Sequence, residues 1–198
     1  MKEMKVKITF LLPPLGTSPA DPNIYENFVG SKAPNAATLA DEVEALGVEA
    51  VVEKGITVFP HDENGNPFLY DYQVRGFFKG ACGALRSVPD TRSSKIKAYK
   101  KKVDQHIFVN ERQIPIVFDG GTTLCQRPLR AQTMQGERVG LASSEEIPAG
   151  ATCEFTVKCL IDDDMETVRE WLDYGELSGI GQWRNSGRGR FTWEEVAA

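Results

Sequence analysis

Residues 179–191, near the C-terminal end of the sequence, most restrict what this chain can fold into. They read G-I-G-Q-W-R-N-S-G-R-G-R-F, with four glycines in thirteen residues. Each glycine inside a helix costs about 1 kcal/mol relative to alanine, so this stretch is not a helix interior. Glycine also adopts backbone conformations closed to other residues and lets another backbone approach closely. The pattern predicts a shaped loop whose exposed N–H groups suit a phosphate.

Polar and basic side chains fill the positions between these glycines. Arginine binds phosphate through a planar, bidentate contact, and a tryptophan ring can stack on a base. We therefore predict a nucleic-acid site here, formed by Gly179, Gly181, Gln182, Trp183, Arg184, Asn185, Gly187, Arg188, Gly189 and Arg190. The alternative interpretation is a glycine-rich turn between the last helix and the last strand, with solvated arginines.

The net charge of −5 argues against nucleic acid, but its distribution does not. Residues 86–138 hold eleven Lys and Arg against five Asp and Glu, whereas the remainder holds 12 against 23. This asymmetry is typical of a local basic surface on an acidic protein, although basic segments are often merely solvated. The predicted phosphate contacts in this region are Lys95, Lys97, Lys100, Lys101, Lys102, Arg127 and Arg130.

Residues 70–86 have the apolar spacing of an amphipathic helix, with Val74, Phe77, Phe78, Cys82 and Leu85 on one side. Three glycines flank this apolar stripe at positions 76, 80 and 83, which suggests close packing against a sheet or a ligand. Arg75 and Lys79 are four residues apart and share a face. They are candidate phosphate contacts, or else they extend to solvent.

The predicted elements follow the order strand, helix, strand, strand, helix, strand once the long insertions are removed. Strands are expected at residues 5–12, at 107–109 and 114–118 as a hairpin, at 124–132 and 138–143 around a turn at 135–136, at 153–161 and at 189–196, with further helices at 21–32, 38–46 and 162–175. This βαββαβ order predicts an α+β, ferredoxin-like fold, which RNA-recognition domains also use. We expect a single domain over residues 1–198, with insertions at about 13–68 and 87–123. Phe155 and Trp171 should be buried and Trp183 exposed.

Composition argues against a zinc-binding, membrane-spanning or secreted protein. The four cysteines form no CxxC pair, so we expect free thiols in a reducing cytosol and no zinc site. The three aspartates at 162–164 are expected to start a helix rather than bind metal. No apolar run approaches the ~20 residues that span a bilayer, and the N-terminus carries no secretory pattern. We therefore predict a cytoplasmic protein with no cofactor.

Three motifs carry a resemblance to one family. The spacing of Gly179, Gly181, Gly187, Gly189 and Phe191 resembles the C-terminal G-h-G-x5-G-x-G-x-h loop of the RAMP superfamily, although Arg188 stands where an aromatic residue is common. Residues 67–86 are similar to the segment of backbone-forming members that reads like ipGssLKGalR. Residues 145–157 are similar to a hairpin of the same proteins. RAMP proteins are the ferredoxin-like, RNA-binding subunits of CRISPR effector complexes.

The resemblance implies a non-enzymatic protein that binds RNA or single-stranded DNA through the glycine-rich loop and the basic insertion. It also implies a homo-oligomer or filament along the ligand, or a place in a CRISPR effector complex. The chain resembles phage and prophage proteins as well, which implies a stand-alone role.

Two further hypotheses stay open. The chain could be a phage-encoded mimic or inhibitor that binds a host CRISPR complex. It could also be a RAMP-type endoribonuclease, in which case its general acid or base would be one of its two histidines, His61 and His106. Neither histidine has a partner that the sequence reveals, so we predict binding without catalytic residues.

Overall fold

The computed structural model describes residues 1–20, 56–133 and 136–197, and the side chains of residues 129–140 lie outside this description. The chain divides into two compact units. Unit 1 comprises residues 1–14, 60–121 and 147–198, and unit 2 comprises residues 15–59 and 122–146. The helices expected at 21–32 and 38–46 lie outside the described residues.

A six-stranded sheet forms the centre of unit 1. Its strands are β1 (Lys2–Phe10), β4 (Phe68–Tyr70), β5 (Ile107–Val109), β6 (Gln113–Val117), β9 (Thr152–Cys159) and β10 (Phe191–Glu195). They lie in the order β10-β1-β9-β6-β4, with β5 also paired to β9, and every pairing is antiparallel. The first strand of the chain is therefore central, between two strands from its C-terminal part.

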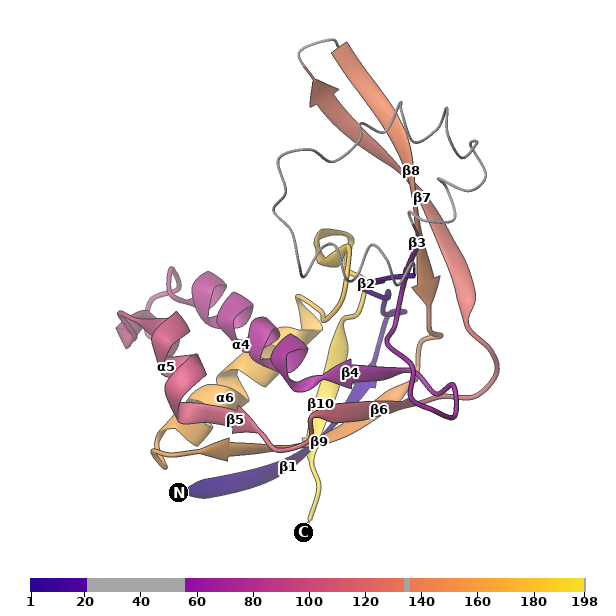
Figure 1. The fold of residues 1–198 in the computed structure, drawn as a ribbon. Coiled ribbons are helices and arrows are strands. Elements are labelled where there is room, and N and C mark those ends of the chain that lie inside the picture. Colours follow the sequence, from indigo (N-terminus) through magenta and orange to yellow (C-terminus); the bar gives the residue numbers. More distant parts are fainter. Residues whose placement is uncertain (21–55, 134–135, 198) are drawn as a thin grey trace, which may run out of the picture. The chain divides into compact units, whose positions relative to one another are not determined.

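Three α-helices belong to unit 1: α4 (Asp71–Leu85), α5 (Tyr99–His106) and α6 (Asp164–Asp173). Figure 1 shows them gathered on one side of the sheet. Unit 1 also contains three short 3₁₀ turns, η1 (Ser93–Lys95) before α5, and η2 (Tyr174–Glu176) and η3 (Arg184–Ser186) after α6. The chain is thus an α+β protein, as predicted, and the glycine-rich stretch lies between α6 and β10, also as predicted.

Alternation along the strands builds the core between the sheet and these helices. In β1 the side chains of Met4, Val6, Ile8 and Phe10 are buried, and in β9 the same holds for Cys153, Phe155, Val157 and Cys159. The ring of Trp171 on α6 packs 5.6 Å from that of Phe78 on α4, measured between centroids. Trp171 and Phe155 are buried and Trp183 is 41% exposed, which confirms the three expectations.

Unit 2 contains a second, four-stranded sheet. It consists of β2 (Ser18–Pro19), β3 (Ile56–Val58), β7 (Thr123–Thr133) and β8 (Gly136–Glu146), in the order β2-β3-β8-β7. Strands β7 and β8 form an antiparallel pair over their whole length, at the two strand candidates that the sequence joins by a turn, and β3 runs parallel to β8.

One prediction about strand pairing was wrong. The segments at 107–109 and 114–118 were expected to pair with each other as a hairpin. Instead β5 pairs with the C-terminal half of β9 and β6 with its first two residues. Both segments bury alternate apolar residues, and β9 is eight residues long, so its one edge accommodates them in succession. Each of the two segments thus pairs with β9, which is distant in sequence, instead of with its neighbour in the chain.

Candidate nucleic-acid interface

The glycine-rich loop is closed at its base by two backbones in direct contact. A Cβ atom on Gly179 would lie 2.0 Å from the carbonyl carbon of Gly189, and one on Gly189 would lie 1.9 Å from the oxygen of Ile180. The amide of Ile180 donates a hydrogen bond of 3.0 Å to the Gly189 oxygen. Gly189 also has a φ of +71°, which favours glycine. The packing of the loop itself therefore requires these two glycines.

The tip of the loop is one 3₁₀ turn between two left-handed residues, Trp183 (φ +55°) and Gly187 (φ +87°). Hydrogen bonds from the amides of Ser186 and Gly187 to the oxygens of Trp183 and Arg184 close this turn. A left-handed conformation is rare for a bulky side chain. Trp183, Arg184 and Asn185 are all exposed at this tip.

The tip lies against a bare part of α4. A Cβ atom on Gly80 would stand 3.6 Å from an Nη atom of Arg184, and one on Gly76 would meet nothing within 4 Å. Both glycines are exposed, because Val74, Phe77, Phe78 and Ala81 turn the other side of the helix to the core. They therefore pack against no sheet, so the first of the two suggested roles does not apply to them.

The basic segment, residues 95–102, reaches the same side of α4. The hydroxyl of Tyr99, the first residue of α5, lies 3.2 Å from the position of a Cβ atom on Gly83. Residues three or four apart on a helix are surface neighbours. The exposed Gly76 and Gly80 and the half-buried Gly83 thus form one strip, which we call the glycine face of α4. The loop tip and the start of the basic segment flank this face.

Outside the glycine-rich loop, the structure separates the predicted lysines and arginines of unit 1 into two groups. Arg75, Lys79 and Lys102 are in ion pairs with Asp71, Asp104 and Asp164, at 2.8, 2.6 and 2.6 Å. Lys95, Lys97, Lys100 and Lys101 are exposed. A partner anion lowers the positive potential that a phosphate would meet, so the second group has more charge available for a ligand.

Two cavities adjoin the basic segment. One of about 320 Å³ is lined by Lys97, Lys101, Lys102 and His106 among others, and one of about 370 Å³ by Arg92, Lys95 and Lys102 among others. His106 Nδ1 lies 3.8 Å from Oδ2 of the buried Asp164, and neither atom has a hydrogen-bond partner among the described residues. A carboxylate beside an imidazole can fix its orientation.

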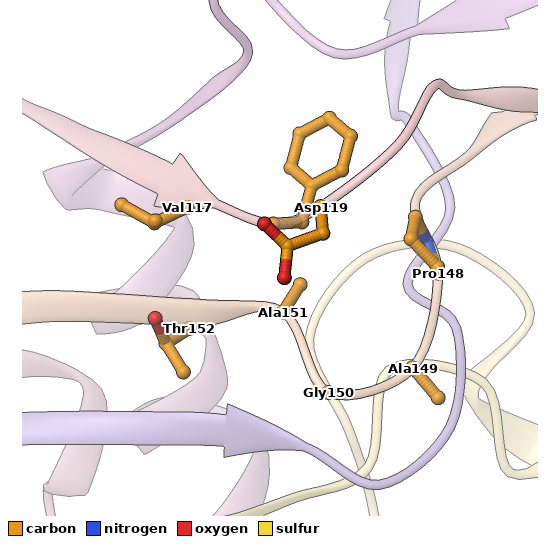
Figure 2. Close-up of a pocket in the computed structure, with 8 residues that line it drawn as sticks. Val117, Asp119, Pro148, Ala149, Gly150, Ala151 and Thr152 are labelled. Carbon is orange, nitrogen blue, oxygen red and sulfur yellow. The ribbon is translucent and has the colours of Figure 1, made fainter.

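A third cavity, of about 330 Å³, lies where β6 ends and β9 begins. Its walls are mostly small or apolar, from Val117 and Phe118 to Pro148 and Ala151, and Figure 2 shows the carboxylate of Asp119 among them. A carboxylate repels phosphate, and no predicted site residue lines this cavity.

The two predicted arginines of β7 belong to unit 2. Arg127 is 5% exposed and donates a hydrogen bond of 3.0 Å to the Ser144 hydroxyl. The side chain of Arg130 lies outside the described residues. The structure therefore brings together the loop, α4 and the basic segment within unit 1, and places these two arginines in the other unit.

The open face of the sheet carries no stacking platform on its central strands. Lys5 pairs with Glu154 at 2.9 Å and Lys7 with Glu194 at 3.6 Å, and threonines occupy neighbouring outward positions. RNA-recognition domains stack bases on aromatic residues at this face. The exposed aromatic residues Tyr72 and Trp183 lie on the helix side, on α4 and at the loop tip, whereas Phe108 on the outer strand β5 is exposed on the open face.

Sequence reasoning missed two residues at the start of α4. Tyr72, four residues before Gly76, is 46% exposed. The guanidinium of Arg112, from the turn between β5 and β6, lies 5.6 Å from its ring centroid. The Tyr-x-Tyr pattern before the helix was a visible signal for an aromatic pair, whereas nothing local connects residue 112 to it.

Other kinds of site find no support in the described part of the chain. No group of three His, Cys, Asp or Glu side chains there is placed to hold a metal ion. Likewise, no helix among those residues is long and apolar enough to cross a membrane.

Comparisons with known proteins complete the description. No family model and no curated protein matches the sequence. A chain from the cryo-EM structure of the Type III-B Cmr-beta bound to cognate target RNA is similar in fold, with a TM-score of 0.53 and 8% identity. The similarity covers 99% of this chain but 60% of that one. The α+β fold described above is thus shared with a chain of the RNA-bound Cmr-beta structure.

Proposed function

We propose that this chain binds single-stranded nucleic acid, RNA or DNA, across the glycine face of α4. One observation carries the proposal: the Arg184 guanidinium stands over Gly80, next to the open Gly76. Glycine lets a ligand backbone approach the helix closely, and arginine supplies charged donors for a phosphate. The glycines of α4 and the arginine of the loop lie in separate parts of the sequence. Taken alone, the glycines could serve packing and the arginine could simply be solvated.

The fold is consistent with a RAMP-type protein. Apart from β4 and α5, unit 1 follows the order β1, α4, β5 with β6, β9, α6, β10, and the order β10-β1-β9-β6 within its sheet supports a ferredoxin-like core. We infer that unit 2 is an elaboration inserted into this core at two points. The RNA-bound Cmr-beta neighbour favours RNA as the first ligand to test and CRISPR-related assembly as the context.

In the proposed complex the sugar–phosphate backbone lies along the glycine face. Arg184 contacts a phosphate from one side, and the exposed lysines of the basic segment attract the strand from the other. Trp183 at the loop tip offers a ring for stacking. Arg75 and Lys79 also lie along this path, but they are ion-paired with Asp71 and Asp104. They should therefore attract the phosphates less strongly than Arg184 does.

Fluorescence anisotropy with a labelled 20-nucleotide single-stranded RNA tests this proposal. Arg184→Gln should weaken binding about 10- to 100-fold, because a hydrogen bond to a charged group contributes about 1.5–3 kcal/mol. Arg169→Gln is the matched control, since Arg169 on α6 is paired with Glu166 and Glu195. Equal affinity of the wild type and Arg184→Gln, or no binding by the wild type at low salt, would refute the proposal.

RNA cleavage is a second candidate function, favoured by the position of His106. The imidazole lines a cavity with three lysines and stands beside the buried Asp164. A histidine can act as general base or acid, and lysines can stabilise charge on a phosphate. Incubation of a 5′-labelled RNA with wild type and with His106→Ala tests it. Metal-independent products from the wild type alone would support cleavage, and intact RNA in both would dismiss it.

A further inference from the structure

Three aromatic rings form a ladder that ends at the surface beside the glycine face. Phe68 is buried, and its ring meets Tyr70 edge-on with centroids 4.9 Å apart. Tyr70 in turn stacks on Tyr72 with centroids 5.2 Å apart and an interplanar angle of 18°. Tyr72, the outermost ring, is 46% exposed. The buried end of the ladder therefore fixes an aromatic ring at the surface of unit 1.

An arginine lies beside the two outer rings. The guanidinium carbon of Arg112 is 5.1 Å from the Tyr70 centroid and 5.6 Å from that of Tyr72. Its Nη1 donates to Asp71, a residue only 9% exposed, which also accepts a bond of 2.8 Å from Arg75. The Arg112 side chain is nevertheless 67% exposed. Asp71 thus fixes one end of a cation whose remaining donors are accessible.

This cluster continues the glycine face. Tyr72, Gly76 and Gly80 follow each other at intervals of four, so they share one side of α4. At a rise of 1.5 Å per residue, the tyrosine stands about 12 Å along the helix from Gly80 and the Arg184 guanidinium. A strand held by its phosphates at Arg184 would pass the aromatic ring as it leaves the loop.

We propose that Tyr72 and Arg112 form a stacking platform for one base of the bound single strand. The inference rests on the proposed function and names a subsite of the same interface. An aromatic face accepts any base, and an arginine beside it adds cation–π attraction. Asp71, Arg75 and Arg112 together carry one net positive charge, so the platform also favours the adjoining phosphate. Asp71 is a positioning residue, because it acts through Arg112.

The test separates contacts to bases from contacts to phosphates. Binding of a labelled oligoriboadenylate of twelve nucleotides is compared with that of an abasic RNA of equal length, at 50 mM salt. Tyr72→Ala should weaken adenylate binding about 5- to 150-fold, the range found for loss of one stacked base, and leave abasic binding unchanged. Tyr72→Phe should bind both as the wild type does. Trp193→Ala is the matched control, because Trp193 forms an arginine–aromatic pair with Arg169 elsewhere.

The alternative is that the cluster only stabilises the start of α4. In that case Tyr72→Ala would weaken both oligomers equally, or neither, and the platform would be refuted while the proposed binding stood. If Tyr72→Ala fails to fold by circular dichroism, Tyr72→Leu replaces it, with loss of adenylate binding alone expected again. A wild type that binds neither oligomer would overturn both the platform and the proposed function.

Discussion

An Nη atom of Arg184 lies 3.6 Å from the point where a Cβ atom of Gly80 would stand. This relationship joins the glycine-rich loop to α4, which lies far from it in the sequence. In the proposed complex the two kinds of residue have separate roles, because the glycine face would admit the ligand backbone and the loop arginine would bring a charge to it.

The first prediction concerns the glycines at the base of the loop. Gly189→Ala should lower the free energy of unfolding by about 2–5 kcal/mol, because the new Cβ would overlap the Ile180 oxygen and the residue has a left-handed φ. Gly187→Ala should cost about 1–2 kcal/mol for its left-handed φ, since its Cβ would meet only flexible side chains, those of Leu12 at 3.3 Å and Arg190 at 3.5 Å. Urea unfolding measures both, and equal stability of Gly189→Ala and the wild type would contradict the loop geometry.

A second prediction compares two tryptophans. Trp171→Ala should cost about 3–5 kcal/mol, because the ring is fully buried between α4 and the sheet and its Nε1 donates to Ser93. Trp183→Gly should leave stability nearly unchanged, since glycine adopts the left-handed conformation at no steric cost. Thermal melts of both variants measure these changes in stability. Similar large losses of stability in both would show that the loop tip is packed.

The third prediction is a salt dependence. Each phosphate neutralised on a single strand steepens the slope of log affinity against log salt by about 0.7. The double change Lys100→Gln and Lys101→Gln should therefore flatten the slope by up to about 1.4. Titrations of labelled RNA between 50 and 300 mM salt measure it, and an unaltered slope would mean that these exposed lysines contact no phosphate.

A fourth prediction follows from the buried cysteines. Burial, with the negative charge of Asp164 as a smaller cause, raises the pKa of Cys159 to about 11. Burial also raises the pKa values of Cys82 and Cys153. Because the thiolate is the reactive form, iodoacetamide at pH 8 should leave all three unmodified in the folded protein. Mass spectrometry of the native protein would contradict this burial if it found rapid labelling of Cys159, and urea-unfolded protein is the positive control.

Much of unit 1 could be predicted because its signals are local. The apolar stripe placed α4 to within a residue at its start, alternation predicted β9, and a turn signal between two strand candidates predicted the β7–β8 pair. The pairing of β5 and β6 with β9 could not be read in this way. Short strands choose partners by the burial they gain, and that depends on a distant edge rather than on the turn between them.

The candidate site was predictable in its parts and not in its assembly. The glycine loop and the basic segment were visible as composition, but their meeting on α4 depends on tertiary packing. Asp71 and Arg112 illustrate the limit, since a buried carboxylate joins an arginine that is 41 positions away. Arg127 was predicted to contact phosphate because it lies in a basic stretch of the sequence. In the structure it is buried and bonded to Ser144.

The central claim is that the glycine face of α4 is open so that a strand can lie on it. Gly76 tests this most directly, because a Cβ there meets nothing within 4 Å and its φ is ordinary for a helix. Gly76→Leu and the control Gly76→Ala should both stabilise the fold, by up to about 1 kcal/mol, through better helix propensity.

RNA affinity and thermal stability are then measured on the same samples of both variants. The account predicts that Gly76→Leu binds at least tenfold more weakly than the wild type while melting at the same or a higher temperature, and that Gly76→Ala lies between them in affinity. Wild-type affinity in a stable Gly76→Leu protein would contradict it.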